Sequence, residues 1–330
     1  MNFHEVAVAV AGLGPRALEQ ALGSSHGLPE TAVDHAMNYR PLIQVEELRK
    51  RLAGPESGRP IILDVRFRMG SSDGQQEFEK AHIPGASYVD LNTELATIRP
   101  DGVGGRHPLP PLETFVSAMR SAGVTMSRPV VAYDDWASVP ASRLWWMLRH
   151  RGFNAVRVLD GGIAAWTSAG HLTESGSGTP QPGDFSPSNP GIGRLLDAKD
   201  AKRYAEQHLL LDARPADRFR GENESIDPVA GHIPGALSAP ALANTHPDGR
   251  WLGPEQIAAR FEELGATDER DAADPRGTAE ARTVGTYCGS GLQATHLALA
   301  LSVAGITDHA AVYIGSWSDW ITDPARSVEV

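Results

Sequence analysis

The stretch Ile61-Ile-Leu-Asp-Val-Arg66 returns later in the chain as Leu209-Leu-Leu-Asp-Ala-Arg214, each time a short apolar run that ends in Asp-x-Arg. Ala81-His-Ile-Pro-Gly-Ala86 likewise returns as Gly231-His-Ile-Pro-Gly-Ala236, at nearly the same interval. Ordered repeats at a constant interval indicate duplicated structural units. The sequence therefore predicts two copies of one domain.

Two further matches extend the duplication toward the end of each copy. Val130-Val-Ala-Tyr-Asp134 corresponds to Val284-Gly-Thr-Tyr-Cys288, and Leu159-Asp-Gly-Gly-Ile-Ala-Ala-Trp166 corresponds to Tyr313-Ile-Gly-Ser-Trp-Ser-Asp-Trp320. The second copy thus carries a cysteine where the first carries an aspartate. Because a carboxylate cannot perform thiol chemistry and repels an anion, we expect the first copy to be inactive.

The alternation of strand-like and helical patterns indicates the fold of each copy. Short runs rich in β-branched residues or leucine alternate with apolar residues at helical spacing, which predicts an α/β fold with a mostly parallel sheet flanked by helices. A polar stretch rich in Gly, Pro and Ser at 174–192 is typical of an exposed linker. We therefore expect an N-terminal extension at 1–38, an inactive domain at 39–173 and a catalytic domain at 193–330.

Composition excludes several classes of partner. The 330 residues carry a net charge of −11, which argues against nucleic acid and anionic membranes, since both require a cationic surface. No apolar run approaches the length of a transmembrane helix. A small anionic substrate stays compatible with this charge, because a few arginines can form a local positive pocket.

Cys288 is the only cysteine in the sequence. An intramolecular disulfide and a cysteine-rich zinc site are therefore excluded, and a reducing, cytoplasmic location is expected. We expect neither a bound metal nor a cofactor. A group taken up by Cys288 has to leave to an external acceptor, because no second cysteine can resolve it.

The residues around Cys288 favour a nucleophile. A strand-like run ends at Tyr287, a glycine-punctuated turn follows, and apolar residues at helical spacing begin at Leu292. Backbone N–H groups of such a strand-to-helix loop can converge on the sulfur, and the helix N-terminus adds partial positive charge. A buried, inert cysteine is the alternative, but Gly289 and Gly291 suit an anion-binding loop better than a packed core.

Taken together, these motifs resemble the tandem-domain rhodanese family, the thiosulfate and 3-mercaptopyruvate sulfurtransferases. The resemblance covers about residues 39–325. It implies that Cys288 takes a sulfane sulfur from a small anionic donor, becomes a persulfide, and passes the sulfur to a thiol or cyanide acceptor. A thioredoxin-like reductant is one acceptor consistent with this chemistry.

The loop resembles that of the mercaptopyruvate enzymes. Family members that prefer thiosulfate tend to have basic residues after the cysteine, whereas mercaptopyruvate enzymes tend to read Cys-Gly-Ser-Gly-Val-Thr-Ala. This chain reads Cys288-Gly-Ser-Gly-Leu-Gln-Ala294. The resemblance implies donor contacts from the five residues that follow the cysteine, namely Gly289, Ser290, Gly291, Leu292 and Gln293.

Arg218 matches the family arginine that holds the donor's anionic group, and we expect it to serve donor binding more than the fold. Two departures leave the donor open. The second arginine, about nine residues later in mercaptopyruvate enzymes, is missing from the segment 222–231. The family's proton relay is matched by Ser290 and His107, but Asn92 stands at its aspartate position. Thiosulfate and 3-mercaptopyruvate therefore both remain candidate donors, and the loop sequence favours 3-mercaptopyruvate.

Two other functions compete with sulfur transfer. A cysteine phosphatase loop needs an arginine after five intervening residues, and alanine at position 294 in this stretch argues against that class. A non-enzymatic persulfide carrier or sensor that docks a protein partner is compatible with the acidic, tandem-domain chain. Multiple turnover with small donors and acceptors distinguishes an enzyme from such a carrier.

Overall fold

The computed structural model describes residues 40–330 except 70–72, 100–101, 179, 189–190 and 267–282. The N-terminal extension predicted at 1–38 lies outside the described residues. Within the described ranges, no helix combines the length and apolar character needed to cross a lipid bilayer.

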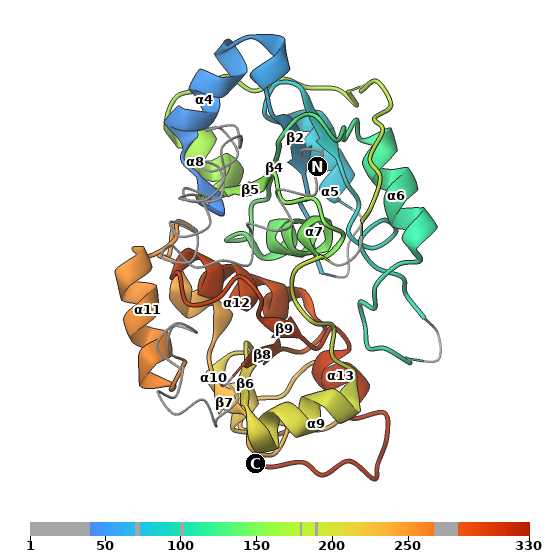
Figure 1. Cartoon of the computed structure of the whole chain (residues 1–330), viewed down its shortest axis with the longest axis vertical. Coiled ribbons are helices and arrows are strands. Elements are labelled where there is room, and N and C mark those ends of the chain that lie inside the picture. Colours follow the sequence, from blue (N-terminus) through green and yellow to red (C-terminus); the bar gives the residue numbers. More distant parts are fainter. Residues whose placement is uncertain (1–39, 70–72, 100–101, 179, 189–190, 267–282) are drawn as a thin grey trace, which may run out of the picture. The chain divides into compact units, whose positions relative to one another are not determined.

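The strands form two sheets, one from each copy of the repeat (Figure 1). The first sheet has the order β1-β5-β4-β2-β3 and the second the order β7-β6-β8-β9, and all neighbouring strands are parallel. The expected α/β fold with two parallel sheets is therefore confirmed. The strands span β1 (Leu42–Ile43), β2 (Ile61–Asp64), β3 (Ala86–Tyr88), β4 (Val130–Tyr133), β5 (Val156–Leu159), β6 (Leu209–Asp212), β7 (Leu237–Ser238), β8 (Val284–Tyr287) and β9 (Ala311–Val312).

Helices alternate with these strands along the chain. Those of the first copy are α4 (Val45–Ala53), the 3-10 helix η1 (Glu56–Gly58), α5 (Gly74–Lys80), α6 (Leu112–Ser121), α7 (Val139–His150) and α8 (Gly162–Ser168). Those of the second copy are α9 (Ala198–Gln207), α10 (Ala216–Phe219), the 3-10 helix η2 (Ala241–Asn244), α11 (Pro254–Glu263), α12 (Leu292–Val303) and α13 (Ser316–Trp320).

Each sheet lies between two layers of helices because successive strand residues face opposite sides. In β6, Leu209 and Leu211 belong to the same hydrophobic cluster as α11 and α12, whereas Leu210 packs with α9 and α13. In the first sheet, one face packs against α6 and α7 and the other against α4, α5 and α8. All four residues of β6 are buried, which explains its continuous apolar sequence.

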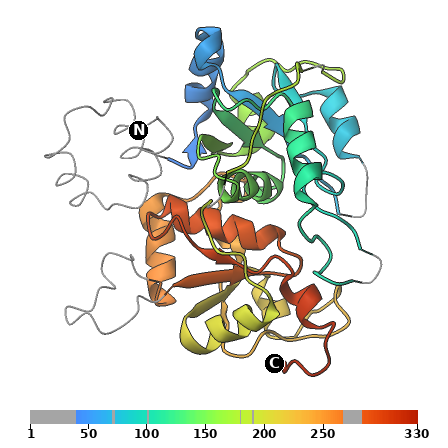
Figure 2. The same ribbon diagram turned by 45° about the vertical axis from the view of Figure 1, so that its right-hand side comes forward.

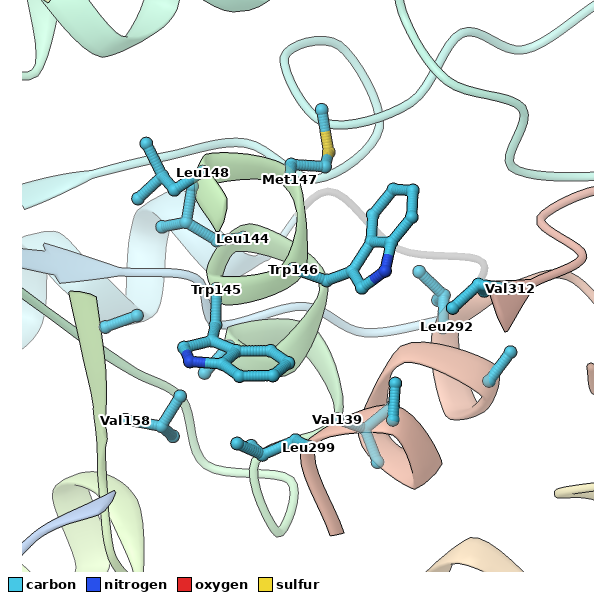
Figure 3. Close-up of a cluster of buried hydrophobic side chains, with 14 of the residues drawn as sticks. Val139, Leu144, Trp145, Trp146, Met147, Leu148, Val158, Leu292, Leu299 and Val312 are labelled. Carbon is cyan, nitrogen blue, oxygen red and sulfur yellow. The ribbon is translucent and has the colours of Figure 1, made fainter. Parts of the chain in front are cut away.

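The two copies share one hydrophobic core. Helices α7 and α12 lie side by side in both views (Figures 1 and 2), and one cluster of buried side chains includes residues from both. Trp146 projects from α7 toward Leu292 and Val312 of the second copy, while Trp145 lies nearer Val158 of its own sheet (Figure 3). This shared core packs the two copies against each other.

The duplicated motifs make the same contacts in both copies. Arg66 pairs with Asp64 at 2.7 Å and donates to the Ala81 carbonyl. Arg214 pairs with Asp212 at 2.7 Å and donates to the Gly231 carbonyl. Each arginine therefore fastens a central strand to the following His-Ile-Pro-Gly turn, which explains why the two motifs occur together.

The predicted linker is exposed along most of its described length, with one exception. Phe185 is fully buried and packs edge-on against Phe115 and Phe153 of the first copy. The Gly183 and Phe185 N–H groups also donate to carbonyls of that copy. This part of the segment 174–192 therefore belongs to the first copy's core, because one aromatic residue anchors an otherwise polar stretch.

Candidate active site

Cys288 follows directly after β8 and precedes α12 (Figure 1). Its side chain is buried, with 2% of the residue exposed. The residue lies in the strand-to-helix loop that the sequence predicts. Ligands of parallel sheets bind beyond the carboxyl ends of the strands, and Cys288 occupies that position. The loop thus places the sulfur at the functional edge of the second sheet.

Two backbone N–H groups donate to the sulfur. The N–H of Gly291 lies 3.0 Å from Cys288 Sγ, and that of Ser290 lies 3.4 Å away. Gly291 has φ +88°, and a Cβ there would lie 2.4 Å from the Ile314 carbonyl oxygen. Only glycine fits position 291, so this glycine follows from the need to direct the loop amides at the sulfur.

Helix α13 fixes the outer side of the loop. The Trp317 and Ser318 N–H groups donate to the carbonyls of Cys288 and Gly289, at 2.8 and 3.0 Å. The Cys288 N–H donates to Ser316 Oγ at 3.1 Å. These bonds hold the peptide planes of the loop, so its N–H groups stay oriented without rearrangement when negative charge forms on the sulfur.

Arg218 extends from α10 toward this loop. Its Nε and Nη2 atoms bind the Glu224 carboxylate, and Nη2 also binds Asp227 Oδ2 at 2.9 Å. Nη1 has no hydrogen-bond partner among the described residues and lies 3.5 Å from where a Cβ of Gly289 would sit. The arginine thus presents a free donor beside the sulfur site.

The same contacts give Arg218 a structural role beside the donor binding that the sequence predicts. The Glu224 and Asp227 side chains are each 3% exposed, and Arg218 pairs with both, beside Arg214 at Glu224 and Arg106 at Asp227. Burial of Glu224 opposes its ionisation, but the N–H groups of Asp227 and Ile226 and the arginine charge outweigh burial, so its pKa is lowered. Removing the guanidinium takes away one of the two cations that compensate each buried carboxylate, which destabilises a fold.

Arg143 supplies a second positive charge near the sulfur, from the first copy. The side chain is fully buried on α7, and its Nη1 has no hydrogen-bond partner among the described residues. Burial lowers the pKa of Arg143 to about 9, and the negative charge of Cys288 opposes that shift. The guanidinium is therefore still charged in neutral solution and places a positive charge near the sulfur.

His107 and Ser290, the two predicted relay residues, are both among the described residues but are not linked by a hydrogen bond. Burial, with the charges of Arg143 and Arg106, lowers the pKa of His107 to about 4, so its ring is neutral in neutral solution. His107 Nδ1 has no hydrogen-bond partner within the described ranges. No hydrogen bond between the His107 ring and the Ser290 hydroxyl occurs in that part of the chain, so the proton relay stays a prediction.

Leu292 and Gln293 differ in their surroundings. Leu292 is 4% exposed, and its side chain packs in the shared core near Trp146 (Figure 3). Gln293 is half-buried at the start of α12. A donor contact through the Leu292 side chain is therefore unfavourable, because that side chain is needed in the core; the role of Gln293 stays a prediction.

The corresponding loop of the first copy contains its own anion. Asp134 replaces the cysteine, and its carboxylate accepts N–H bonds from Trp136, Ser138 and Ala141 at 2.8–3.0 Å. Burial raises the pKa of Asp134 to about 7 against these three donors. The carboxylate thus uses the amide donors that a substrate anion would need.

Comparison with known proteins agrees with this geometry. The family model of the rhodanese-like domain matches twice, over residues 44–169 and 192–323. The chain belongs to the rhodanese family. The predicted tandem arrangement of two rhodanese domains is therefore confirmed.

Curated relatives identify the enzyme class. The probable 3-mercaptopyruvate sulfurtransferase of Pseudomonas aeruginosa is 41% identical over 296 residues, covering 88% of this chain and 99% of its own. The putative thiosulfate sulfurtransferase SseB of Mycobacterium tuberculosis is 39% identical over 276 residues, covering 83% and 92%. This rhodanese is accordingly a sulfurtransferase.

Solved structures show the same fold. The 3-mercaptopyruvate sulfurtransferase from Leishmania major aligns with a TM-score of 0.72 at 28% identity, over 86% of this chain and 74% of that one. The Escherichia coli 3-mercaptopyruvate sulfurtransferase SseA aligns with a TM-score of 0.68 at 28% identity, over 84% and 99%. The full tandem fold of this rhodanese is thus shared with sulfurtransferases.

Sequence reasoning missed several residues of the site. Ser316 binds the Cys288 N–H, and Arg143 and Arg106 bring charge from the first copy. Ser316 lies in a repeated motif and Arg106 is adjacent to the predicted His107, so the sequence offered a reason to consider both as site residues. Arg143 lies within a helical apolar pattern, where nothing in the sequence distinguishes it from a surface arginine.

Proposed function

We propose that this rhodanese takes the sulfur of 3-mercaptopyruvate onto Cys288 as a persulfide and transfers it to a thiol acceptor. The observation that supports the proposal most is the pair of N–H groups directed at Cys288 Sγ beside the free Nη1 of Arg218. One group stabilises charge on the nucleophile, and the other can bind the carboxylate of the donor.

The chemistry has two half-reactions. The Cys288 thiolate attacks the donor's thiol sulfur, an S–S bond forms, and the C–S bond breaks. The electron pair of that bond leaves with the carbon fragment, which takes up a proton and departs as pyruvate. An acceptor thiolate then attacks the outer sulfur, and the S–S bond electrons return to Cys288 as the thiolate. Such covalent transfer predicts ping-pong kinetics.

The charge balance near the loop favours 3-mercaptopyruvate over thiosulfate. Arg218 and Arg106 both approach Gly289, but Glu224 and Asp227 compensate them. With both arginines compensated in this way, Arg143 adds one further positive charge near the sulfur, and such a site suits a donor with one negative charge better than a dianion. The two relatives described above are named after different donors. The proposed donor preference of this enzyme therefore rests on the charged residues near the loop.

Turnover with 3-mercaptopyruvate is expected to exceed turnover with thiosulfate on the same preparation. We expect kcat/KM to differ by at least about tenfold, which corresponds to roughly 1.4 kcal/mol of differential transition-state binding. Pyruvate release and sulfite release measure the two reactions with a common thiol acceptor. A higher value for thiosulfate would contradict the donor assignment, and a single turnover with either donor would favour a non-enzymatic carrier.

Replacing Arg218 with alanine is expected to lower kcat/KM for the donor by roughly ten- to a hundredfold, because a charge-assisted clamp typically contributes about 1.5–3 kcal/mol. The melting temperature should fall as well, because Glu224 and Asp227 each lose one of their two arginine partners. Lysine at the site should recover only part of the activity, since it lacks the planar fork. The matched control is Arg220→Ala, which removes an exposed arginine paired with Glu222. Equal behaviour of the two alanine variants would contradict the assignment.

The remaining proposals concern the acceptor and the first copy. Because Cys288 has no cysteine partner in the chain, we propose a thioredoxin-like dithiol as acceptor and a cytoplasmic location, where dithiols stay reduced. We also propose domains at 39–173 and 193–330 joined by 174–192, with the first catalytically inactive. The Asp134 carboxylate in the amide-lined loop supports that inactivity.

A further inference from the structure

A loop of the first copy packs directly against α13 of the second. The Gly104 N–H donates to Asp319 Oδ1 at 2.9 Å, and the Arg106 N–H donates to Ser318 Oγ at 3.1 Å. Gly105 has φ +85°, and a Cβ there would lie 2.3 Å from the Gly315 carbonyl oxygen. This close approach, visible as the segment that leads into α6 and extends to α13 (Figures 1 and 2), brings Arg106 to the catalytic loop.

The Arg106 side chain reaches the same point as Arg218. Its Nη2 lies 2.8 Å from where a Cβ of Gly289 would sit, and the free Nη1 of Arg218 lies 3.5 Å from that position. The Arg106 side chain keeps 32% of its surface exposed, so its guanidinium is accessible to a small solute. Two guanidinium groups, one from each copy, therefore converge beside the residue that follows Cys288.

Asp227 holds this arginine pair together. Its Oδ1 pairs with Arg106 Nη1 and its Oδ2 pairs with Arg218 Nη2 at 2.9 Å. A buried carboxylate between two guanidinium groups offsets their mutual repulsion, so the two side chains can lie close together. Asp227 stands nine residues after Arg218, where the resemblance to mercaptopyruvate enzymes implied an arginine. The missing positive charge is therefore supplied from the other copy.

Arg143 fixes the loop that carries Arg106. Its Nη2 donates to the carbonyls of His107 and Leu95, at 2.9 and 3.2 Å, and the side chain is fully buried. A charged donor to two buried carbonyls holds the backbone on both sides of the loop. The backbone at Arg106 is thus held by contacts with α7 and α13, and the ion pair with Asp227 directs its side chain.

We propose that Arg106 is the second donor-binding arginine of this enzyme, so that the donor's carboxylate is held by one guanidinium from each copy. The identity of the donor in this inference rests on the proposed function. The role of Arg106 itself applies to any anionic reagent that reacts with Cys288. The first copy then contributes a substrate-binding residue, and donor binding requires both copies.

Alkylation of Cys288 tests this inference without turnover. Iodoacetate carries a carboxylate close to its reacting carbon, iodoacetamide is its neutral analogue, and a single cysteine makes the intact mass unambiguous. We expect Arg106→Gln to lower the ratio of the iodoacetate rate to the iodoacetamide rate at least about threefold, and kcat/KM for 3-mercaptopyruvate at least about tenfold. Arg106→Lys should retain part of the ratio.

The matched control is Arg68→Gln. Arg68 also belongs to the first copy and also binds an aspartate, Asp135, at 2.5 Å. This control should leave both the alkylation ratio and kcat/KM unchanged. Arg106→Gln leaves Asp227 paired with Arg218, so its melting temperature should stay close to that of the unmodified enzyme.

Each outcome is decisive. An unchanged alkylation ratio in Arg106→Gln overturns the inference, and equal slowing of both reagents overturns it too, because that result shows only a displaced loop. If the unmodified protein turns over no sulfur donor while Arg106→Gln still lowers the ratio, the proposed function fails and this inference stands.

Discussion

Replacing Cys288 with serine is expected to lower multiple turnover by at least about a thousandfold, because the covalent route disappears with the nucleophile. A serine hydroxyl is not ionised in neutral solution and forms no stable bond to a sulfane sulfur. The loop amides at 3.0 and 3.4 Å stay in place around the shorter side chain, so the fold should be little affected. Steady-state pyruvate release measures the loss, and the melting temperature serves as the control.

Ser290→Ala is a useful companion to this variant. The Ser290 N–H contacts Cys288 Sγ, but its hydroxyl is a proposed relay group only. We therefore expect Ser290→Ala to keep measurable turnover. Residual multiple turnover in Cys288→Ser at the level of Ser290→Ala would contradict covalent transfer through the cysteine.

Replacing Gly291 with alanine is expected to lower kcat/KM at least about a hundredfold, because the loop loses its correctly placed N–H donor. A side chain at φ +88° costs roughly 1–2 kcal/mol. The new Cβ would also meet the Ile314 carbonyl oxygen at 2.4 Å, and that atom belongs to the backbone after β9. The loop has to shift, so the N–H at 3.0 Å from the sulfur is displaced and the melting temperature falls.

Gly289→Ala is the matched control for that prediction. Gly289 does not have a positive φ, and the atoms nearest to a Cβ there would be the ends of the Arg106 and Arg218 side chains. Flexible side chains move aside more easily than a backbone carbonyl, so this variant should retain most of its stability and a larger share of its activity. A Gly291→Ala variant as active as the unmodified enzyme would show that the geometry at Gly291 is not what activates the sulfur.

The duplication and the catalytic loop were predictable because their determinants are local. The Asp-x-Arg and His-Ile-Pro-Gly motifs each fasten a strand to the next turn, so both copies retain them. The Cys288 loop is likewise specified by a strand end, two glycines and a helix start within a few residues. Such local patterns can be interpreted before any tertiary structure is known.

The donor-binding arginine pair could not be predicted in this way. Arg106 and Asp227 are far apart in the sequence and meet only because the loop before α6 packs against α13. The missing arginine in 222–231 signalled a departure from the family, but the sequence gives no indication of where compensation arises. Phe185 is similar, since its burial depends on the Phe115 and Phe153 rings that the fold brings to it.

The most direct test of sulfur transfer through Cys288 is the intact mass of the protein after incubation with 3-mercaptopyruvate in the absence of an acceptor. We predict a mass increase of one sulfur atom, which cyanide or a thiol reductant removes. Because the chain contains one cysteine, the Cys288→Ser variant should show no increase. The same increase in that variant, or none in the unmodified protein, would contradict the account.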